Sequence, residues 1–262
     1  MRLAVAATAP FGADVLRQLA HRHDVAYLLT RPDRPKGRGR HVAPPPAKQV
    51  AEELGIEVRQ PERPADLGDP GVEVVVAAAY GALIPAELLE RALWLNVHPS
   101  LLPRWRGAAP VERAIMAGDE VTGVSIIRLV EELDAGPIGA VGDFGIGIDD
   151  NAGVVFRRAA DMGSELLDAV LAQKRFTPQL GEATYAAKIM PADRQLDWSW
   201  PAVELHNRIR ALSPHIGAWG ELHGRRVIIW RSRLVDGRLE LLEVQPEGRR
   251  RMTLAEFERG LR

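Results

Sequence analysis

The sequence predicts an α/β fold class with a mostly parallel sheet, followed by a smaller β-rich domain. Three observations support this class. Short apolar runs alternate with segments of helical periodicity over roughly the first two thirds of the chain, as in a parallel sheet with helical crossovers. The clearest runs are apolar at every position after the first, which is typical of strands covered on both faces. Beyond residue 213 the pattern changes to successive strand-like segments.

Each expected strand of the first domain is a short run rich in valine, isoleucine, leucine and alanine. The clearest one covers 73–79, where three consecutive valines precede three alanines. The expected strands are 2–7, 24–30, 57–59, 73–79, 94–98 and 123–130. Because helical segments separate most of these runs, neighbouring strands of the sheet are expected to be parallel.

The expected helices carry apolar residues three and four positions apart. The longest covers 151–173, and Asp150 or Asn151 is placed to cap its start. Its apolar face is formed by Val155, Ala159, Met162, Leu166 and Val170. The other helices expected in this domain are 13–21, 47–54, 85–91 and 111–117.

A polar, extended stretch from about residue 174 separates the two predicted domains. We divide the chain into an α/β domain over 1–185, a linker over 186–200 and a small domain over 201–262. The small domain is expected to begin with a helix over 201–212, which Ser213 and Pro214 end. Strands at 219–222, 226–233 and 239–244 and a helix at 254–261 should complete it.

Composition excludes several kinds of chemistry. The 262 residues include no cysteine, so disulfides, thiolate metal sites and cysteine nucleophiles are absent. The formal charge is −1, and 46% of residues are hydrophobic, which is a globular composition without an overall polyanion signal. The apolar start is too short to span a bilayer and lacks a signal-peptide pattern, so we expect a cytoplasmic protein without membrane association.

The turn after the first strand argues against a nicotinamide dehydrogenase. Close approach of a pyrophosphate to a helix N-terminus requires several glycines in that turn. Here the segment 6–12 contains a single glycine, Gly12, at its end. A Rossmann oxidoreductase is therefore disfavoured although the sheet is of the same general type.

Asn96 and His98 end an apolar strand and lie two residues apart, so their side chains share one face. Open α/β sheets bind ligands at the carboxyl ends of their strands. An amide and an imidazole at that edge can both donate hydrogen bonds to one developing oxyanion. Asp134 follows the next expected strand and precedes a Gly-Pro turn, so its carboxylate can reach the same edge and serve in proton transfer.

The same residue types also allow a purely structural interpretation. Asn96 would then cap a turn, His98 would be a buried histidine with satisfied hydrogen bonds, and Asp134 would be a turn former. Residue types by themselves leave both interpretations open.

A longer motif favours the catalytic interpretation. The segment 96–110 reads Asn-Val-His-Pro-Ser-Leu-Leu-Pro-Arg-Trp-Arg-Gly-Ala-Ala-Pro and resembles the signature of the 10-formyltetrahydrofolate-dependent formyltransferases. In that family the asparagine, the histidine and a later aspartate in a Leu-Asp-x-Gly segment form the active site. All three match here, at Asn96, His98 and Asp134. The resemblance implies a Rossmann-like first domain and transfer of a formyl group to a primary amine.

The resemblance also implies a cosubstrate and its binding site. The cosubstrate would be 10-formyltetrahydrofolate, and no metal would be required. Rigid apolar walls around the folate would come from Ser100, Leu101, Leu102, Pro103, Leu83 and Ile84. Arg104 and Arg106 would suit a phosphate or the glutamate tail of the folate, or else belong to a solvated loop.

Three further segments are similar to the members of this family that formylate initiator methionyl-tRNA in translation initiation: 31–40, 78–85, and the pair 185–189 and 196–198. The resemblance implies that Phe11 contacts the methionyl side chain. Residues 31–48 carry six basic side chains and one acid, Asp33. The residues expected to contact the RNA backbone are Arg34, Lys36, Arg38 and Arg40; a solvated loop is the alternative.

Two departures from the family pattern stand out. Ala7 occupies a position that is usually glycine, and only three strands are expected in the small domain, fewer than the five of an OB-fold. We therefore expect a reduced OB-like domain. Two alternative functions stay open: formyl transfer to an amino-sugar nucleotide, and a non-catalytic RNA-binding relative. We expect the chain to be a monomer.

Overall fold

The computed structural model describes residues 1–36 and 41–261. These residues form two compact units, which interleave along the chain. Unit 1 consists of Met1–Arg106, Gly123–Asp143 and Arg157–Ala183, and unit 2 of Gly107–Thr122, Phe144–Phe156 and Thr184–Arg262. Because both units draw on separate segments, neither coincides with the continuous ranges 1–185 and 201–262. That division into a domain, a linker and a second domain stays a prediction.

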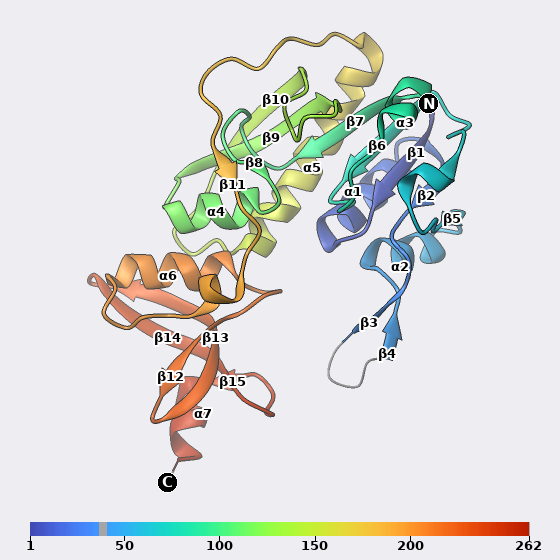
Figure 1. Cartoon of the computed structure of the whole chain (residues 1–262). Helices are drawn as coiled ribbons and strands as arrows, with labels where there is room; N and C mark the ends of the chain where they lie inside the picture. Colours follow the sequence, from blue (N-terminus) through green and yellow to red (C-terminus); the bar gives the residue numbers. More distant parts are fainter. Residues whose placement is uncertain (37–40, 262) are drawn as a thin grey trace. The chain divides into compact units, whose positions relative to one another are not determined.

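Unit 1 is organised around a twisted sheet of mostly parallel strands (Figure 1). In the part of the chain that the structure describes, this sheet has seven strands in the order β10-β9-β7-β6-β1-β2-β5. Their bounds are β1 (Arg2–Ala7), β2 (Asp24–Leu29), β5 (Val58–Arg59), β6 (Val74–Ala78), β7 (Leu93–His98), β9 (Val121–Arg128) and β10 (Ile138–Gly145). Strands β5, β2, β1, β6 and β7 pair in parallel, whereas β9 is antiparallel to β7.

The central strands have the burial that their apolar sequences predict. All five residues of β6 are buried, as are Leu3 to Ala7 of β1. The helices of this part of the chain are α1 (Pro10–Ala20), α2 (Pro46–Glu53), α3 (Ala86–Arg91) and α5 (Ala152–Gln173), with a 3-10 turn η1 (Pro64–Leu67). A short hairpin of β3 (Arg34–Lys36) and β4 (His41–Ala43) lies outside the main sheet.

Strand β10 is absent from the sequence-based prediction because its glycines weaken the strand signal. These glycines are required by close packing. A Cβ atom at Gly139 would lie 2.8 Å from Cγ1 of Val170, and one at Gly142 would lie 2.7 Å from Sδ of Met162. Both partners belong to α5, so the glycines allow this helix to approach β10 closely.

Unit 2 contains a small antiparallel sheet in the order β12-β13-β14-β15. Its strands are β12 (Ala218–Leu222), β13 (Arg225–Val235), β14 (Arg238–Pro246) and β15 (Met252–Thr253). Its helices are α4 (Pro110–Ala117), α6 (Ala202–Ala211) and α7 (Leu254–Arg259), with a 3-10 turn η2 (Pro191–Arg194) and a two-strand ladder of β8 (Arg106–Gly107) and β11 (Tyr185–Ala186). The three predicted strands are present, and β15 adds a fourth in the described residues.

Helix α6 packs on this sheet through its predicted apolar face. Leu205, Ile209 and Leu212 form one buried cluster with Val227 and Val244 of the sheet. The predicted fold class, an α/β domain with a mostly parallel sheet and a small antiparallel β domain, is confirmed. None of the helices in residues 1–36 and 41–261 combines the length and the apolar character needed to cross a bilayer.

Unit 2 also buries a polar cluster beneath its sheet. His206 is 1% exposed, and its Nδ1 lies 2.9 Å from the Ser232 hydroxyl, while its Nε2 donates to the Ile148 carbonyl over the same distance. Nearby Arg210 donates to the carbonyls of Gly147 and Asp150. Burial lowers the pKa of His206, with a smaller contribution from the positive charge of Arg210.

Candidate active site

Asn96 and His98 occupy the carboxyl end of β7, where the predicted site lies. Asn96 is half-buried, and His98 is 4% exposed. Their side chains lie on the same face because they are two residues apart in a strand. The strand ends at His98 because Pro99 follows it and cannot donate a backbone hydrogen bond.

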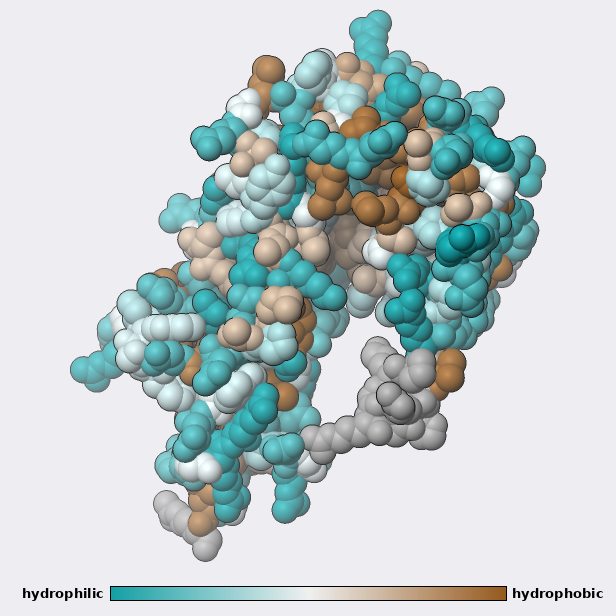
Figure 2. Space-filling model, viewed as in Figure 1, coloured by the Kyte–Doolittle hydropathy of each residue, from teal (hydrophilic) through white to brown (hydrophobic). Residues whose placement is uncertain are grey.

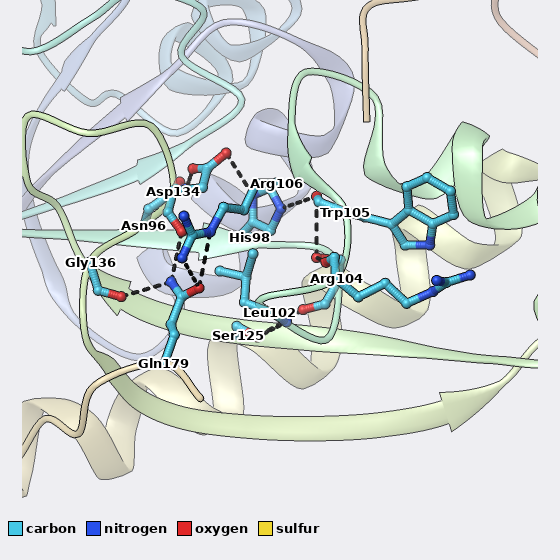
Figure 3. Close-up of polar contacts among 11 residues, drawn as sticks. Asn96, His98, Leu102, Arg104, Trp105, Arg106, Ser125, Asp134, Gly136 and Gln179 are labelled. Carbon is cyan, nitrogen blue, oxygen red and sulfur yellow. Dashed lines mark hydrogen bonds and ion pairs between the residues drawn. The ribbon is translucent and has the colours of Figure 1, made fainter. Parts of the chain in front are cut away.

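Asp134 reaches this pair from the loop between β9 and β10 (Figure 3). Its carboxylate is 7% exposed. Asn96 Nδ2 donates to Asp134 Oδ1 at 3.3 Å, and His98 Nδ1 lies 3.7 Å from Asp134 Oδ2. The structure therefore brings together the three residues that the sequence predicts as catalytic, with both nitrogen donors directed toward one carboxylate.

The second ring nitrogen of His98 fixes the proton arrangement. His98 Nε2 lies 2.9 Å from the carbonyl oxygen of Trp105. Since a carbonyl can only accept, Nε2 must carry a hydrogen. In a neutral ring Nδ1 would then be unprotonated and would face Asp134 with a lone pair. A proton shared between Nδ1 and the Asp134 carboxylate is needed for attraction between them.

The loop 99–106 holds the Trp105 carbonyl in place. Ser100 is fully buried, and its hydroxyl donates to the Arg104 carbonyl at 2.7 Å. Ser125 in β9 donates to the Ser100 carbonyl and accepts from the Leu102 amide. Trp105 itself has a left-handed backbone with φ of 63°. The fully buried Ser100 side chain thus supports the loop, and its predicted part in the folate site stays a prediction.

The other residues predicted to line a folate pocket lie in two loops. Leu101, Leu102 and Pro103 belong to the loop after His98; Leu102 is buried, and the other two are half-buried. Leu83 and Ile84 belong to the turn after β6, the strand beside β7. Leu83 is 74% exposed, whereas Ile84 packs against the core of unit 1. The role of these five side chains in folate binding stays a prediction.

Exposed apolar side chains occur in several segments of unit 1. Besides Leu83, they include Val130 and Leu133, which precede Asp134, and Leu180, which follows α5. Figure 2 shows apolar side chains gathered over unit 1 on the viewed face. An exposed apolar surface beside a polar cluster is the usual composition of a small-molecule site.

The residues predicted to contact the acceptor lie elsewhere in unit 1. Phe11 is buried in the first turn of α1. Arg34 is exposed and begins β3, the strand that also contains Lys36. Arg38 and Arg40 lie outside the described residues. Ala7, the residue that departs from the usual glycine, is fully buried at the end of β1.

Sequence reasoning missed one polar side chain of the site, Gln179. Its amide donates to the backbone carbonyls of Asp134 and Gly136, at 2.7 and 2.9 Å, and its oxygen accepts from Arg106 (Figure 3). Arg106 is thus bound within unit 1, while Arg104 is exposed and lies over the Trp105 ring at 4.6 Å. Gln179 falls in the stretch that reads as a polar linker, and no local pattern distinguishes it.

Residues 1–36 and 41–261 contain no group of three or more His, Asp or Glu side chains arranged to hold a metal ion.

Comparison with known proteins defines the class. The family model described as formyl transferase matches residues 1–171, and that described as formyl transferase, C-terminal domain, matches residues 188–238. Among solved structures, methionyl-tRNA formyltransferase from Clostridium thermocellum has a TM-score of 0.67 at 15% identity and covers 94% of this chain and 98% of its own. An N-formyltransferase from Helicobacter canadensis, in complex with folinic acid and dTDP-3-aminofucose, has a TM-score of 0.68 at 17% identity, over 89% of this chain and 88% of its own. These two structures show the shared fold.

Sequence identity defines the branch. Methionyl-tRNA formyltransferase of Paracoccus denitrificans is 42% identical over 291 aligned positions, which cover all of this chain and 98% of the relative. The chain belongs to the methionyl-tRNA formyltransferase family. The predicted family and enzyme class are thereby confirmed. The alignment is longer than the 262 residues of the chain, so the relative has segments that this chain lacks.

Proposed function

We propose that this chain transfers a formyl group from 10-formyltetrahydrofolate to the amino group of initiator methionyl-tRNA, with Asn96, His98 and Asp134 as catalytic residues. Family membership supports the reaction and the acceptor. The observation that carries the residue assignment is the buried cluster in which Asn96 Nδ2 and His98 Nδ1 both face Asp134.

The reaction begins with attack of the neutral amine on the formyl carbon. A nitrogen–carbon bond forms, and the formyl oxygen becomes an oxyanion on a tetrahedral carbon. Asn96 Nδ2 donates to this oxygen, and the protonated Nδ1 of His98 supplies a second donor. Such a donor typically contributes about 3–4 kcal/mol to the transition state.

Proton transfer completes the reaction. The attacking nitrogen loses one proton to the Asp134 carboxylate, directly or through water. The folate nitrogen receives a proton as its bond to the formyl carbon breaks, and the oxyanion returns to a carbonyl. The His98 Nε2–H bond to Trp105 keeps the imidazole oriented throughout. The products are the N-formylated amine and tetrahydrofolate, and no metal is required for this balance.

The folate donor is assigned to the apolar loops beside the cluster. Leu101, Leu102 and Pro103 follow His98 in the chain, and Leu83 and Ile84 lie in the turn after the neighbouring strand β6. Ser100 supports the first loop from its buried side. Exposed Leu83 provides the kind of surface on which a pterin ring packs.

One experiment tests the reaction and its acceptor together. Release of tetrahydrofolate from 10-formyltetrahydrofolate is measured with initiator methionyl-tRNA, with an amino-sugar nucleotide, or without an acceptor. We expect release only with methionyl-tRNA. Release with the sugar nucleotide alone would assign the alternative acceptor. No release with any acceptor, from a folded preparation, would favour a non-catalytic RNA-binding role.

The basic segment 31–40 is proposed to hold the acceptor RNA. Arg34 is exposed, whereas the guanidinium of Arg31 donates to the Gly81 carbonyl and Lys48 pairs with Asp33. Replacing Arg34, Lys36 and Arg38 by alanine removes three charges. If all three meet phosphates, the slope of log affinity against log salt should fall by about 2–3. The KM for methionyl-tRNA should rise, while that for the folate should barely change.

A second charge variant, which removes two charges, uses the small sheet of unit 2. Arg225→Ala and Arg238→Ala together remove two exposed charges from the ends of β13 and β14. If this pair lowers the salt slope and the variant of segment 31–40 does not, the RNA contact belongs to unit 2.

We also propose that the chain acts as a monomer in the cytoplasm. Sedimentation equilibrium of the purified protein tests the oligomeric state.

A further inference from the structure

The backbone at Asp134 adopts a conformation that needs outside support. Its φ is 51°, in the left-handed region. Non-glycine residues are disfavoured there by roughly 1–2 kcal/mol, although aspartate and asparagine tolerate it better than most. Such a conformation persists only when surrounding contacts determine it. The direction of the Asp134 carboxylate therefore depends on what holds its loop.

Gln179 supplies that support through its side-chain amide. Nε2 of Gln179 donates to the carbonyls of Asp134 and Gly136, so both hydrogens of the side-chain amide form hydrogen bonds to the loop of Asp134. Gln179 is brought to this position by the bridge between Thr177 and Ile138, the first residue of β10, in which each residue accepts from the other's amide.

Arg106 fixes the orientation of the Gln179 amide. Its Nε and Nη2 both donate to Oε1 of Gln179, at 3.1 and 2.8 Å. A flipped amide would direct its NH₂ group at a guanidinium and its oxygen at two carbonyls, so only one orientation is satisfied. Arg106 also donates through Nη1 to Glu132, two residues before Asp134, at 3.2 Å. Its side chain is 12% exposed.

Arg106 joins the loop after β7, which supplies the backbone partner of His98, to the loop that carries Asp134. It directly follows Trp105, whose carbonyl accepts from His98 Nε2. Arg106 also contacts the loop of Asp134 on both sides of that residue. It donates directly to Glu132, and it donates to Gln179, which bonds to the Gly136 carbonyl. Figure 3 shows Gln179 and Arg106 beside the cluster of Asn96, His98 and Asp134. One hydrogen-bonded chain thus connects the backbone partner of His98 to the backbone of Asp134.

We infer that Gln179 and Arg106 form a positioning pair that sets the Asp134 carboxylate relative to Asn96 and His98. Neither residue is assigned a contact with substrate. The inference rests on the proposed catalytic role of Asp134. A displacement of about 1 Å at a reacting group lowers rates by roughly a hundredfold, so loss of the pair should act on turnover more than on substrate binding.

The primary variants are Gln179→Ala and Gln179→Glu in the full-length chain. Both should lower kcat about tenfold to hundredfold, with KM for 10-formyltetrahydrofolate and methionyl-tRNA changed less than about threefold. The glutamate retains the shape and the Arg106 contact but directs an oxygen at two carbonyls, so it should be as harmful as alanine. Gln173→Glu at the exposed end of α5 is the matched control and should behave as wild type.

A double-mutant cycle with Asp134→Asn distinguishes positioning from general support. Single-turnover rates are measured at high enzyme concentration, so that slow variants are still quantified. If Gln179 acts through the Asp134 carboxylate, Gln179→Ala should cost less than about threefold in the Asp134→Asn background. Equal losses in both backgrounds would overturn the positioning role. Melting curves of each variant establish that the compared proteins are folded.

The outcomes also separate this inference from the proposed function. Wild-type turnover of Asp134→Asn would contradict the catalytic assignment itself. A slow Asp134→Asn with an unaffected Gln179→Ala would leave that assignment intact and overturn the positioning pair. Arg106→Lys should be nearly as slow as Arg106→Ala, because an ammonium cannot donate twice to Gln179 and once to Glu132 in the geometry of a guanidinium.

Discussion

Two buried histidines, one in each unit, have almost the same list of partners. His98 in unit 1 and His206 in unit 2 each lie 2.9 Å from one backbone carbonyl through Nε2. Each also has an aspartate oxygen at a longer distance, 3.7 Å for Asp134 and 3.6 Å for Asp149. Burial and the presence of a nearby carboxylate therefore do not distinguish a catalytic histidine from a structural one.

The two histidines differ in the contacts of their other ring nitrogen, Nδ1. Nδ1 of His206 lies 2.9 Å from the Ser232 hydroxyl, and its aspartate neighbour is 69% exposed. Among the described residues, Nδ1 of His98 faces Asp134 at the longer distance of 3.7 Å, and Asp134 is itself buried and bonded to Asn96. Both nitrogens of His206 are thus satisfied by short bonds. His98 retains a ring nitrogen whose proton can be shared, which general acid–base chemistry requires.

The largest expected effect is the loss of formyl transfer when His98, but not His206, is replaced. His98→Ala should lower formyl transfer by roughly a hundredfold or more, because one preorganised donor is lost. Folate binding should stay near the wild-type value. Steady-state kinetics with methionyl-tRNA and a fluorescence titration with the folate measure both quantities. If His98→Ala kept the wild-type kcat, His98 would be a structural histidine like His206, and its proposed catalytic role would be wrong.

The second prediction concerns the stability of unit 2. His206→Ala should destabilise the fold by about 2–4 kcal/mol, since it leaves a cavity and an unpaired carbonyl, with kcat per folded molecule nearly unchanged. Because burial lowers the pKa of His206, this group favours folding above its ordinary pKa and opposes it as pH falls below about 6.5. Urea unfolding of the wild type and of His206→Gln between pH 5 and 8 measures this: the stability difference between the two proteins should shrink as pH falls below about 6.5. A difference that does not depend on pH in that range would contradict the prediction.

The third prediction uses another buried ionisable group of unit 2, Glu112 in α4. Its Oε2 is buried and has no hydrogen-bond partner among the described residues, and burial raises its pKa to about 7. The folded state then retains a proton that the unfolded state loses, so stability falls as pH rises from about 4.5 to 7. Glu112→Gln should stabilise the protein at pH 8 by on the order of 2 kcal/mol and have little effect at pH 4. Denaturant midpoints at the two pH values measure this; equal shifts at both would refute the assignment.

The smallest expected effects compare the two serines that support the histidines. Ser232→Ala removes the hydroxyl at His206 Nδ1 and should cost about 1 kcal/mol of stability without affecting kcat. Ser100→Ala removes the bond to the Arg104 carbonyl, next to the carbonyl that holds His98. It should cost a similar amount of stability, about 1 kcal/mol, and additionally lower kcat several-fold. If both variants had the same kcat, the loop 99–106 would not position His98.

The sequence by itself determined most of the elements and part of the site. The valines and alanines of 73–79 predicted β6, and the apolar spacing of 151–173 predicted α5, because a strand and a helix express their periods of two and 3.6 residues locally. The same alternation placed Asn96 and His98 on one face. The match to the formyltransferase motif then indicated that Asp134 joins them.

Only the tertiary structure decided which atoms meet. Asn96 and Asp134 are 38 positions apart, and Arg106 and Gln179 are 73 positions apart, so no local pattern encodes their hydrogen bonds. The glycines of β10 weaken the strand signal, and only the approach of α5 shows why they are needed. Ser100, predicted as part of an apolar wall, is a buried donor to its own loop. Periodicity determines how a segment folds and which face is buried, whereas the orientation of a buried polar group depends on partners that only the packed chain brings within hydrogen-bond distance.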